Sequence, residues 1–131
     1  MKTLLITIAL TSALSVALGH PAHASEWDAA DKALFAGFSV ARVADMAQTL
    51  QIARRPEKIS PGTTYYETNP LMGKHPSTGT VVAYFALSHA LVWLVADQLA
   101  PKTRKAFLVG TIIISAGYVK RNAEIGISVK F

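Results

Sequence analysis

The chain has no cysteine and few charged residues for its length. The absence of cysteine excludes disulfides, thiolate metal sites, cysteine nucleophiles and a lipid anchor on an N-terminal cysteine. Charged residues make up only 16% of the chain, whereas hydrophobic residues make up 51% and the mean hydropathy is +0.33. This balance indicates a membrane protein, and 131 residues leave room for one compact domain.

The sequence also lacks the signatures of nucleotide and nucleic-acid chemistry. It contains no Gly-rich phosphate loop and no nucleophile elbow. The net charge of +5 comes from basic residues scattered around apolar runs, without the aromatic-interleaved basic stripe of a nucleic-acid binder. We therefore expect no nucleic-acid partner and no cofactor, and we favour a non-enzymatic protein over an enzyme.

What is present begins with a segment typical of a signal peptide. Lys2 provides a positive charge, an apolar run follows over 4–18, and residues 22–24 are Ala-His-Ala. This small-x-small pattern is the one after which signal peptidase cleaves. The apolar run is shorter than the ~20 residues of a spanning helix. We predict a signal peptide over 1–24 and a mature membrane domain over 25–131.

Three segments of the mature chain have the composition of long helices. Residues 28–54 lack proline and carry apolar side chains at three-to-four-residue intervals, which is helical spacing. Residues 80–100 contain no glycine or proline, so we predict a transmembrane helix there. A third helix is predicted over 106–122, where flanking lysines extend a short apolar run. The predicted fold is all-α, a small helical membrane bundle with two or three spanning helices and a loop over 55–79.

The distribution of basic residues favours an orientation with the mature N-terminus outside. The residues predicted inside are Arg54, Arg55, Lys58, Lys74, Lys120, Arg121 and Lys130, and those predicted outside are Lys32, Lys102, Arg104 and Lys105. The cluster at 102–105 is the exception to this bias. We place the protein in the bacterial cell envelope, in the inner membrane, with the lipid bilayer as partner and with a homo-oligomer or another membrane protein as a further partner.

The end of the chain allows a second interpretation. Residues 125–131 alternate apolar and polar side chains and end on phenylalanine, as the last strands of outer-membrane β-barrels do. The alternative fold is therefore a small outer-membrane β-barrel. Residues 80–100 argue against it, because they show no such alternation.

Polar residues inside the predicted first helix are candidates for a site. A charge at the centre of a membrane helix costs about 2.5–3.5 kcal/mol on insertion scales, so it needs a reason to be there. Arg42, Asp45 and Thr49 share one face of this helix. Arg42 and Asp45 either neutralise each other inside the bundle or form an ion or substrate site.

His89 is the candidate in the predicted second helix. It lies near the middle of the span, in a stripe with Phe85, Trp93 and Asp97 at steps of four residues, and we expect this stripe to face protein. The alternative function is an intramembrane cation- or proton-binding site built on Asp45, Glu67 and His89, whose side chains have the donor atoms for a divalent metal. Their spacing of 22 residues forms no local chelate.

The loop between these two helices carries four of the six prolines and many hydrogen-bonding side chains. Prolines and glycines forbid a long helix here. Glu67, Asn69 and His75 are the loop residues that we add to the candidate site. Asn69 precedes a proline, which favours a turn.

One block of the sequence resembles a known group of proteins. Its residues are Asp45-x-x-x-Thr49, followed by Glu67-x-Asn69-Pro70-Leu71-x-Gly73-x-His75-Pro76-Ser77. This block is similar to one in uncharacterised small membrane proteins of phages and proteobacteria, and it covers roughly the middle third of the chain. The resemblance implies a membrane location and a prophage origin, and it identifies no reaction. We expect a phage-type or envelope accessory that acts through membrane or partner contacts, for instance in lysis or in exclusion of other phages.

Overall fold

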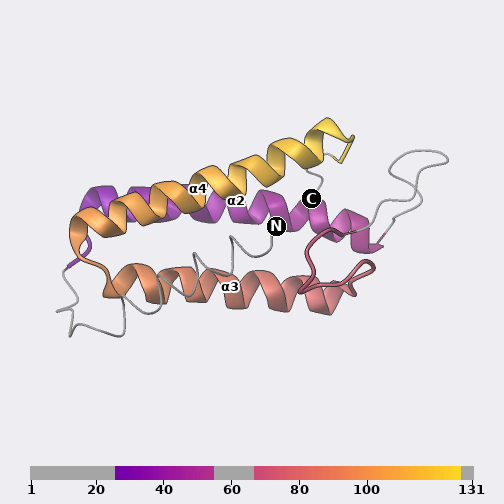
Figure 1. Ribbon diagram of the computed structural model, residues 1–131, viewed down its shortest axis with the longest axis horizontal. Helices are drawn as coiled ribbons and strands as arrows, with labels where there is room; N and C mark the ends of the chain where they lie inside the picture. The colour runs from indigo at the N-terminus through magenta and orange to yellow at the C-terminus, as the bar shows by residue number, and fades with distance from the viewer. Residues whose placement is uncertain (1–25, 55–66, 128–131) are drawn as a thin grey trace.

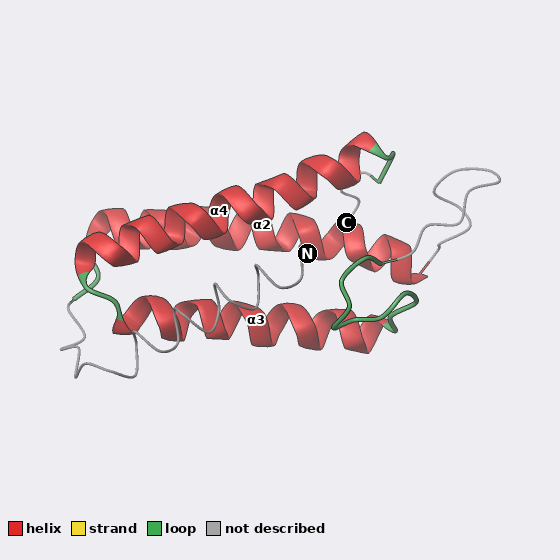
Figure 2. Ribbon diagram, in the orientation of Figure 1, coloured by secondary structure: helices red, strands yellow, loops and turns green. Residues whose placement is uncertain are grey.

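The computed structural model describes residues 26–54 and 67–127. In these residues the chain forms three helices and no strand, namely α2 (Ala29–Arg54), α3 (Thr78–Gln98) and α4 (Pro101–Glu124) (Figures 1 and 2). The predicted all-α fold is confirmed, and the β-barrel alternative is disfavoured. The predicted signal peptide and the last four residues of the alternating tail lie outside the described residues.

The three helices lie roughly along one direction, and α2 packs against both of the others (Figure 1). Contacts between the N-terminal turns of α2 and α4, such as Asp31 with Arg104, show that these two helices run parallel. The hydrogen bond from Gln48 to Val119, near the C-terminal ends of the same two helices, shows the same parallel arrangement. α3 runs antiparallel to both and contacts α4 only sparsely. The packing is therefore centred on α2.

Local signals explain where each helix begins. Asp28 and Asp31 form a capping box at the start of α2, in which each carboxylate accepts a hydrogen bond from the backbone N–H of the other. The Ser77 hydroxyl caps α3 by accepting the Thr80 N–H at 3.0 Å. Pro101 occupies the first turn of α4, a position where the missing N–H costs nothing.

The predicted helix boundaries are close for the first two helices and wrong at the start of the third. Proline at 101 was expected to end one helix and leave a gap before residue 106. Instead α3 ends at Gln98 and α4 begins at Pro101, so that only Leu99 and Ala100 connect them. Proline stops the preceding helix and starts the following one, because its fixed φ suits a helix N-terminus.

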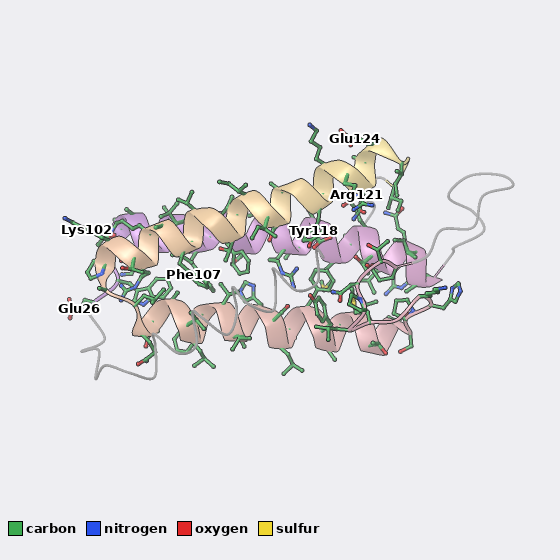
Figure 3. All side chains as sticks on the ribbon, viewed as in Figure 1. Glu26, Lys102, Phe107, Tyr118, Arg121 and Glu124 are labelled. Carbon is green, nitrogen blue, oxygen red and sulfur yellow. The ribbon has the colours of Figure 1, made fainter. Side chains whose placement is uncertain are left out.

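The two ends of the bundle carry the charged residues, and the section between them is apolar. Glu26 and Lys102 lie at one end, and Arg121 and Glu124 lie at the other (Figure 3). Between them, in the described helices, the only Asp, Glu, Lys or Arg residues are Arg42 and Asp45, both of which face inward. α3 is long and apolar enough to cross a membrane, and only 17% of its apolar 18-residue stretch is buried inside the protein.

A small hydrophobic core lies at the loop end of the bundle. Met72 from the loop packs with Val81 and Phe85 of α3, and Met46 and Leu50 of α2 lie against this cluster. The core therefore joins the loop to two helices. It holds in place the segment that follows the predicted site residues Glu67 and Asn69.

Candidate functional site

A polar cluster lies between α2 and α3 in the apolar middle of the bundle. The Arg42 guanidinium donates to the Asp45 carboxylate at 3.3 Å and to the hydroxyl of Ser88. Its Cζ atom lies 4.2 Å from the centroid of the Phe85 ring and 5.7 Å from that of Tyr84, which is cation–π geometry. We call Arg42, Asp45 and Ser88 the mid-bundle cluster. Arg42 and Asp45 thus form an ion pair, which is one of the two interpretations that the sequence allowed.

His89 lies on the same face of α3 but has different partners. Its ring stacks on Phe38, with centroids 5.2 Å apart and planes at 16°, and it also contacts Phe35. Its Nε2 lies 3.5 Å from the Ser39 hydroxyl. His89 is therefore a packing residue between α3 and α2 in this structure, held by two aromatic rings.

The stripe that includes His89 only partly faces protein as expected. Phe85 is buried, and Asp97 accepts a hydrogen bond from Trp27. Trp93 is exposed and lines a groove instead. The second half of the stripe still lies on the side of α2, since Trp93 shares the groove with residues of α2 and Asp97 contacts Trp27 just before α2.

The loop residues build a tight turn. Glu67 accepts the Asn69 N–H at 2.8 Å, and the Asn69 side chain accepts the Leu71 N–H at 3.0 Å. The Asn69 carbonyl then accepts from Met72 and Gly73, and Gly73 has a φ of 75° that favours glycine. These bonds direct Met72 into the core. They give Glu67 and Asn69 a structural role.

The remaining predicted site residues are separated. Thr49 is buried on α2, whereas His75 is exposed in the loop. Asp45 pairs with Arg42, Glu67 bonds within its own turn, and His89 has the aromatic partners given above. In the part of the chain that the structure describes, no three His, Asp or Glu side chains are placed to hold a metal ion. Asp45, Glu67 and His89 do not converge.

A second group of charged residues joins the start of α2, the end of α3 and the start of α4. The sequence analysis did not identify this group. Arg104 is fully buried and donates to the Asp31 carboxylate at 3.0 Å and to the carbonyls of Ala96 and Leu99 at 2.9 and 3.1 Å. Its guanidinium also lies 5.0 Å from the ring centroid of Trp27. One arginine thus connects α4 to the start of α2 and the end of α3.

Two more contacts complete this group. The Lys105 ammonium lies 2.7 Å from an Asp28 carboxylate oxygen and 3.1 Å from one of Asp31. The hydrogen bond from Lys105 lowers the pKa of Asp28 below its ordinary value. The Trp27 indole N–H donates to Asp97 at 2.9 Å. We call the group formed by these residues the ionic end, namely Trp27, Asp28, Asp31, Asp97, Arg104 and Lys105.

The sequence held a signal for the ionic end. Asp28-x-x-Asp31 is a capping pattern at a helix start, and the basic cluster at 102–105 directly follows the helix predicted over 80–100. In an antiparallel three-helix arrangement both lie at the same end of the bundle. The cluster counted as the exception to the positive-inside bias is therefore largely paired, since Arg104 and Lys105 contact carboxylates.

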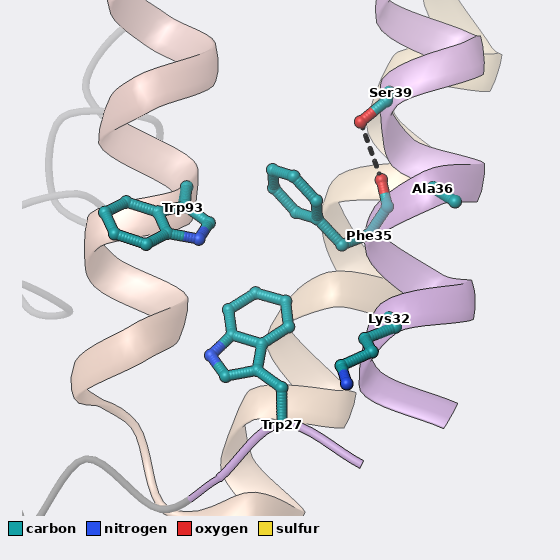
Figure 4. A pocket seen from close by; sticks show the side chains of 6 residues that line it. All are labelled: Trp27, Lys32, Phe35, Ala36, Ser39 and Trp93. Atoms are coloured by element: carbon teal, nitrogen blue, oxygen red, sulfur yellow. Dashed lines mark hydrogen bonds between the residues drawn. The ribbon is translucent and has the colours of Figure 1, made fainter. Parts of the chain in front are cut away.

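An open groove lies beside the ionic end, between α2 and α3. It has a volume of about 610 Å³ and is lined by Trp27, Lys32, Phe35, Ala36, Ser39 and Trp93 (Figure 4). The Trp27 indole meets the Phe35 ring edge-on, with ring centroids 5.5 Å apart, and Trp93 lies across the groove on α3 (Figure 4). The Ser39 hydroxyl donates to the Phe35 carbonyl. The groove is therefore aromatic and apolar, with one cation, Lys32, at its side.

Comparison with protein-family models, with curated proteins and with solved structures finds no match to this chain.

Proposed function

We propose that the chain is a small membrane-embedded protein of the bacterial envelope that acts through contacts with lipid and with other membrane proteins, as a phage-type or envelope accessory. One observation carries this proposal. In the described helices, the only charged residues between the two ends are Arg42 and Asp45, and their side chains are just 12% and 9% exposed and paired with each other.

Apolar side chains cover the outside of the same section. Each of the three helices contributes to this surface, and its most exposed members are Val40, Val43, Leu87, Leu94, Ile113 and Ile114. A water-soluble protein rarely exposes so many large apolar side chains together. The 21 residues of α3 correspond to about 31 Å at 1.5 Å per residue, close to the ~30 Å of a bilayer core.

The distribution of charge at the two ends supports the orientation given by the basic residues. At the ionic end the described residues include four acidic and four basic side chains, counting Glu26, Lys32 and Lys102. At the other end they include four basic and two acidic ones, the latter being Glu67 and Glu124. The more positive end, which holds Arg54 and Arg121, favours the cytoplasmic side.

Leu87→Asp tests whether the bundle lies in a membrane. Leu87 is 72% exposed in the middle of α3, so an aspartate there harms a protein in lipid and is harmless in water. We expect loss of membrane insertion, because the charge costs about 2.5–3.5 kcal/mol at a helix centre. The measurement is the fraction of protein retained in membranes after alkaline carbonate extraction.

Leu71→Asp is the matched control, since Leu71 is 80% exposed but lies in the loop at the end of the bundle. It should leave membrane retention unchanged. Release of the unaltered protein by carbonate, or equal behaviour of both variants, would contradict the proposal.

Cysteine labelling tests the orientation, because the chain has no cysteine of its own. A membrane-impermeant maleimide added to intact cells should label Thr103→Cys, which lies at the ionic end, and should label His75→Cys only after permeabilisation. The reverse pattern would overturn the orientation while leaving the membrane location intact. Entry of an impermeant dye at high expression tests the lysis version, and intact membranes would exclude it.

A further inference from the structure

The groove beside the ionic end combines an apolar wall with one cation at the level where a spanning helix ends. We propose that this groove binds an anionic phospholipid, with the Lys32 ammonium contacting the headgroup phosphate and Phe35 and Ala36 contacting the first part of an acyl chain. This inference rests on the proposed membrane location. The inference adds a class of ligand and a defined binding site to the proposed function.

The position of the groove along the bundle fits the headgroup region. Trp93 lies five residues before the end of α3, about 7.5 Å along the helix axis. Trp27 lies just before α2 begins. Tryptophan rings are enriched at this depth because they have an apolar body and one polar N–H. The two indoles therefore place the groove at the boundary between acyl chains and headgroups.

The charged side chain that lines the groove favours a negative ligand. Of the basic residues at this end, Arg104 and Lys105 contact Asp31 and Asp28. Lys32 lines the groove and forms no ion pair with any residue that the structure describes. A lysine ammonium binds phosphate as a point charge. Lys32 is thus the cation of this end whose charge is available to a ligand in the groove.

The walls of the groove are already held in position. The Trp27 N–H is bonded to Asp97, which keeps the indole against Phe35. The Ser39 hydroxyl is bonded to a carbonyl of its own helix, so it leaves the wall apolar. An acyl chain needs only an apolar wall, and a phosphate needs only the cation. A phospholipid supplies both in one molecule.

Trp27 and Trp93 are the only tryptophans in the chain, so their fluorescence reports on the groove directly. The full chain is reconstituted into phosphatidylcholine vesicles that contain a small fraction of either brominated phosphatidylglycerol or brominated phosphatidylcholine. Bromine quenches a nearby indole. Because one lysine near the surface enriches anionic lipid roughly fivefold, we expect clearly stronger quenching by brominated phosphatidylglycerol than by brominated phosphatidylcholine.

Two lysine variants decide whether the groove causes this preference. Lys32→Gln should abolish it, whereas Lys102→Gln, at the same end but outside the groove, should retain it. Trp27→Phe and Trp93→Phe should each leave a remaining tryptophan that shows the preference. Circular dichroism checks that each variant keeps its helices.

The outcomes separate this inference from the proposed function. Equal quenching by the two lipids, or equal loss of preference in both lysine variants, would overturn the lipid site while leaving the protein in the bilayer. Absence of quenching by either lipid would overturn the membrane location itself, and the site with it.

Discussion

Arg104 at the ionic end and Arg42 in the mid-bundle cluster both face inward, and they are held by different kinds of partner. Arg104 is fully buried, and its donors reach the Asp31 carboxylate and two backbone carbonyls. Arg42 reaches Asp45 at a longer 3.3 Å and one hydroxyl, and much of its remaining contact is with the faces of Phe85 and Tyr84.

The ionic end and the mid-bundle cluster should therefore respond differently to substitution. Carbonyls and carboxylates at hydrogen-bond distance fix a guanidinium in one position, so the ionic end holds the helices rigidly. Aromatic faces allow a cation to move at little cost, since the attraction varies slowly across the ring. We therefore expect the ionic end to determine stability and the mid-bundle cluster to tolerate substitution better.

The largest expected effect is that of Arg104→Met. It takes away one of the two cations, Arg104 and Lys105, that contact the buried Asp31, and it removes the bonds to Ala96 and Leu99; breaking a buried pair costs about 3–5 kcal/mol. The free energy of unfolding in detergent, followed by circular dichroism, measures the loss. Lys102→Met at the same end is the control and should have almost no effect. An unchanged free energy for Arg104→Met would contradict the assigned role of the ionic end.

Arg42→Met should destabilise the bundle by roughly 2–3 kcal/mol, less than Arg104→Met, because Asp45 loses a more distant and partly exposed partner. The double variant Arg42→Met with Asp45→Leu removes both charges. Apolar replacement of a buried pair is often neutral, so the double variant should regain most of the lost stability. If it is less stable than Arg42→Met alone, the pair does more than neutralise itself.

Ser88→Ala should cost about 1 kcal/mol, because it removes one hydrogen bond to Arg42 without stranding a charge. Ser39→Ala is the comparison, since both hydroxyls donate to a carbonyl of their own helix but only that of Ser88 accepts from Arg42. Thermal unfolding in the same detergent compares the two. A larger effect for Ser39→Ala would show that the hydroxyl beside His89, and not the one beside Arg42, joins α2 to α3.

The smallest expected effect is the pH dependence of the contact between Asp28 and Lys105. The folded state lowers the pKa of Asp28 from 3.8 through the Lys105 hydrogen bond. A lowered carboxyl pKa contributes stability above the unfolded value, and that contribution is lost as pH falls through the folded value. Asp28→Asn keeps a good helix cap but removes the charge. The difference in unfolding midpoint between the two proteins should be present at pH 7 and should disappear as the pH falls below 3.8 and through the lowered pKa of Asp28.

Features that depend on neighbours in sequence could be predicted, and those that depend on distant neighbours could not. The helices followed from apolar spacing and proline positions, and the pairing of Arg42 with Asp45 followed from their separation of three residues on one helix. Arg104 and Asp31 are 73 residues apart. The local sequence places each residue near a helix start, but their direct contact depends on α4 packing parallel to α2.

The candidate site shows the same division. Glu67 and Asn69 are candidates because of their polarity, but their side chains accept hydrogen bonds from backbone N–H groups two residues further along the chain, and these bonds shape a turn. His89 was selected for its depth in the helix, and its partners Phe35 and Phe38 come from α2. The groove combines residues from before α2, from α2 and from α3. Its existence could be seen only once the helices were placed.

The contact between Asp31 and Arg104 has a further consequence for how α2 and α4 are aligned. A second polar contact joins the same helices near their other ends, where Gln48 donates to the carbonyls of Val119 and Ile127. If α2 slid by one turn, about 5.4 Å, both contacts would be lost together. Deleting one residue between Asp31 and Gln48 would rotate one contact by about 100° relative to the other. The two contacts together therefore fix both the axial position and the rotation of α2 relative to α4.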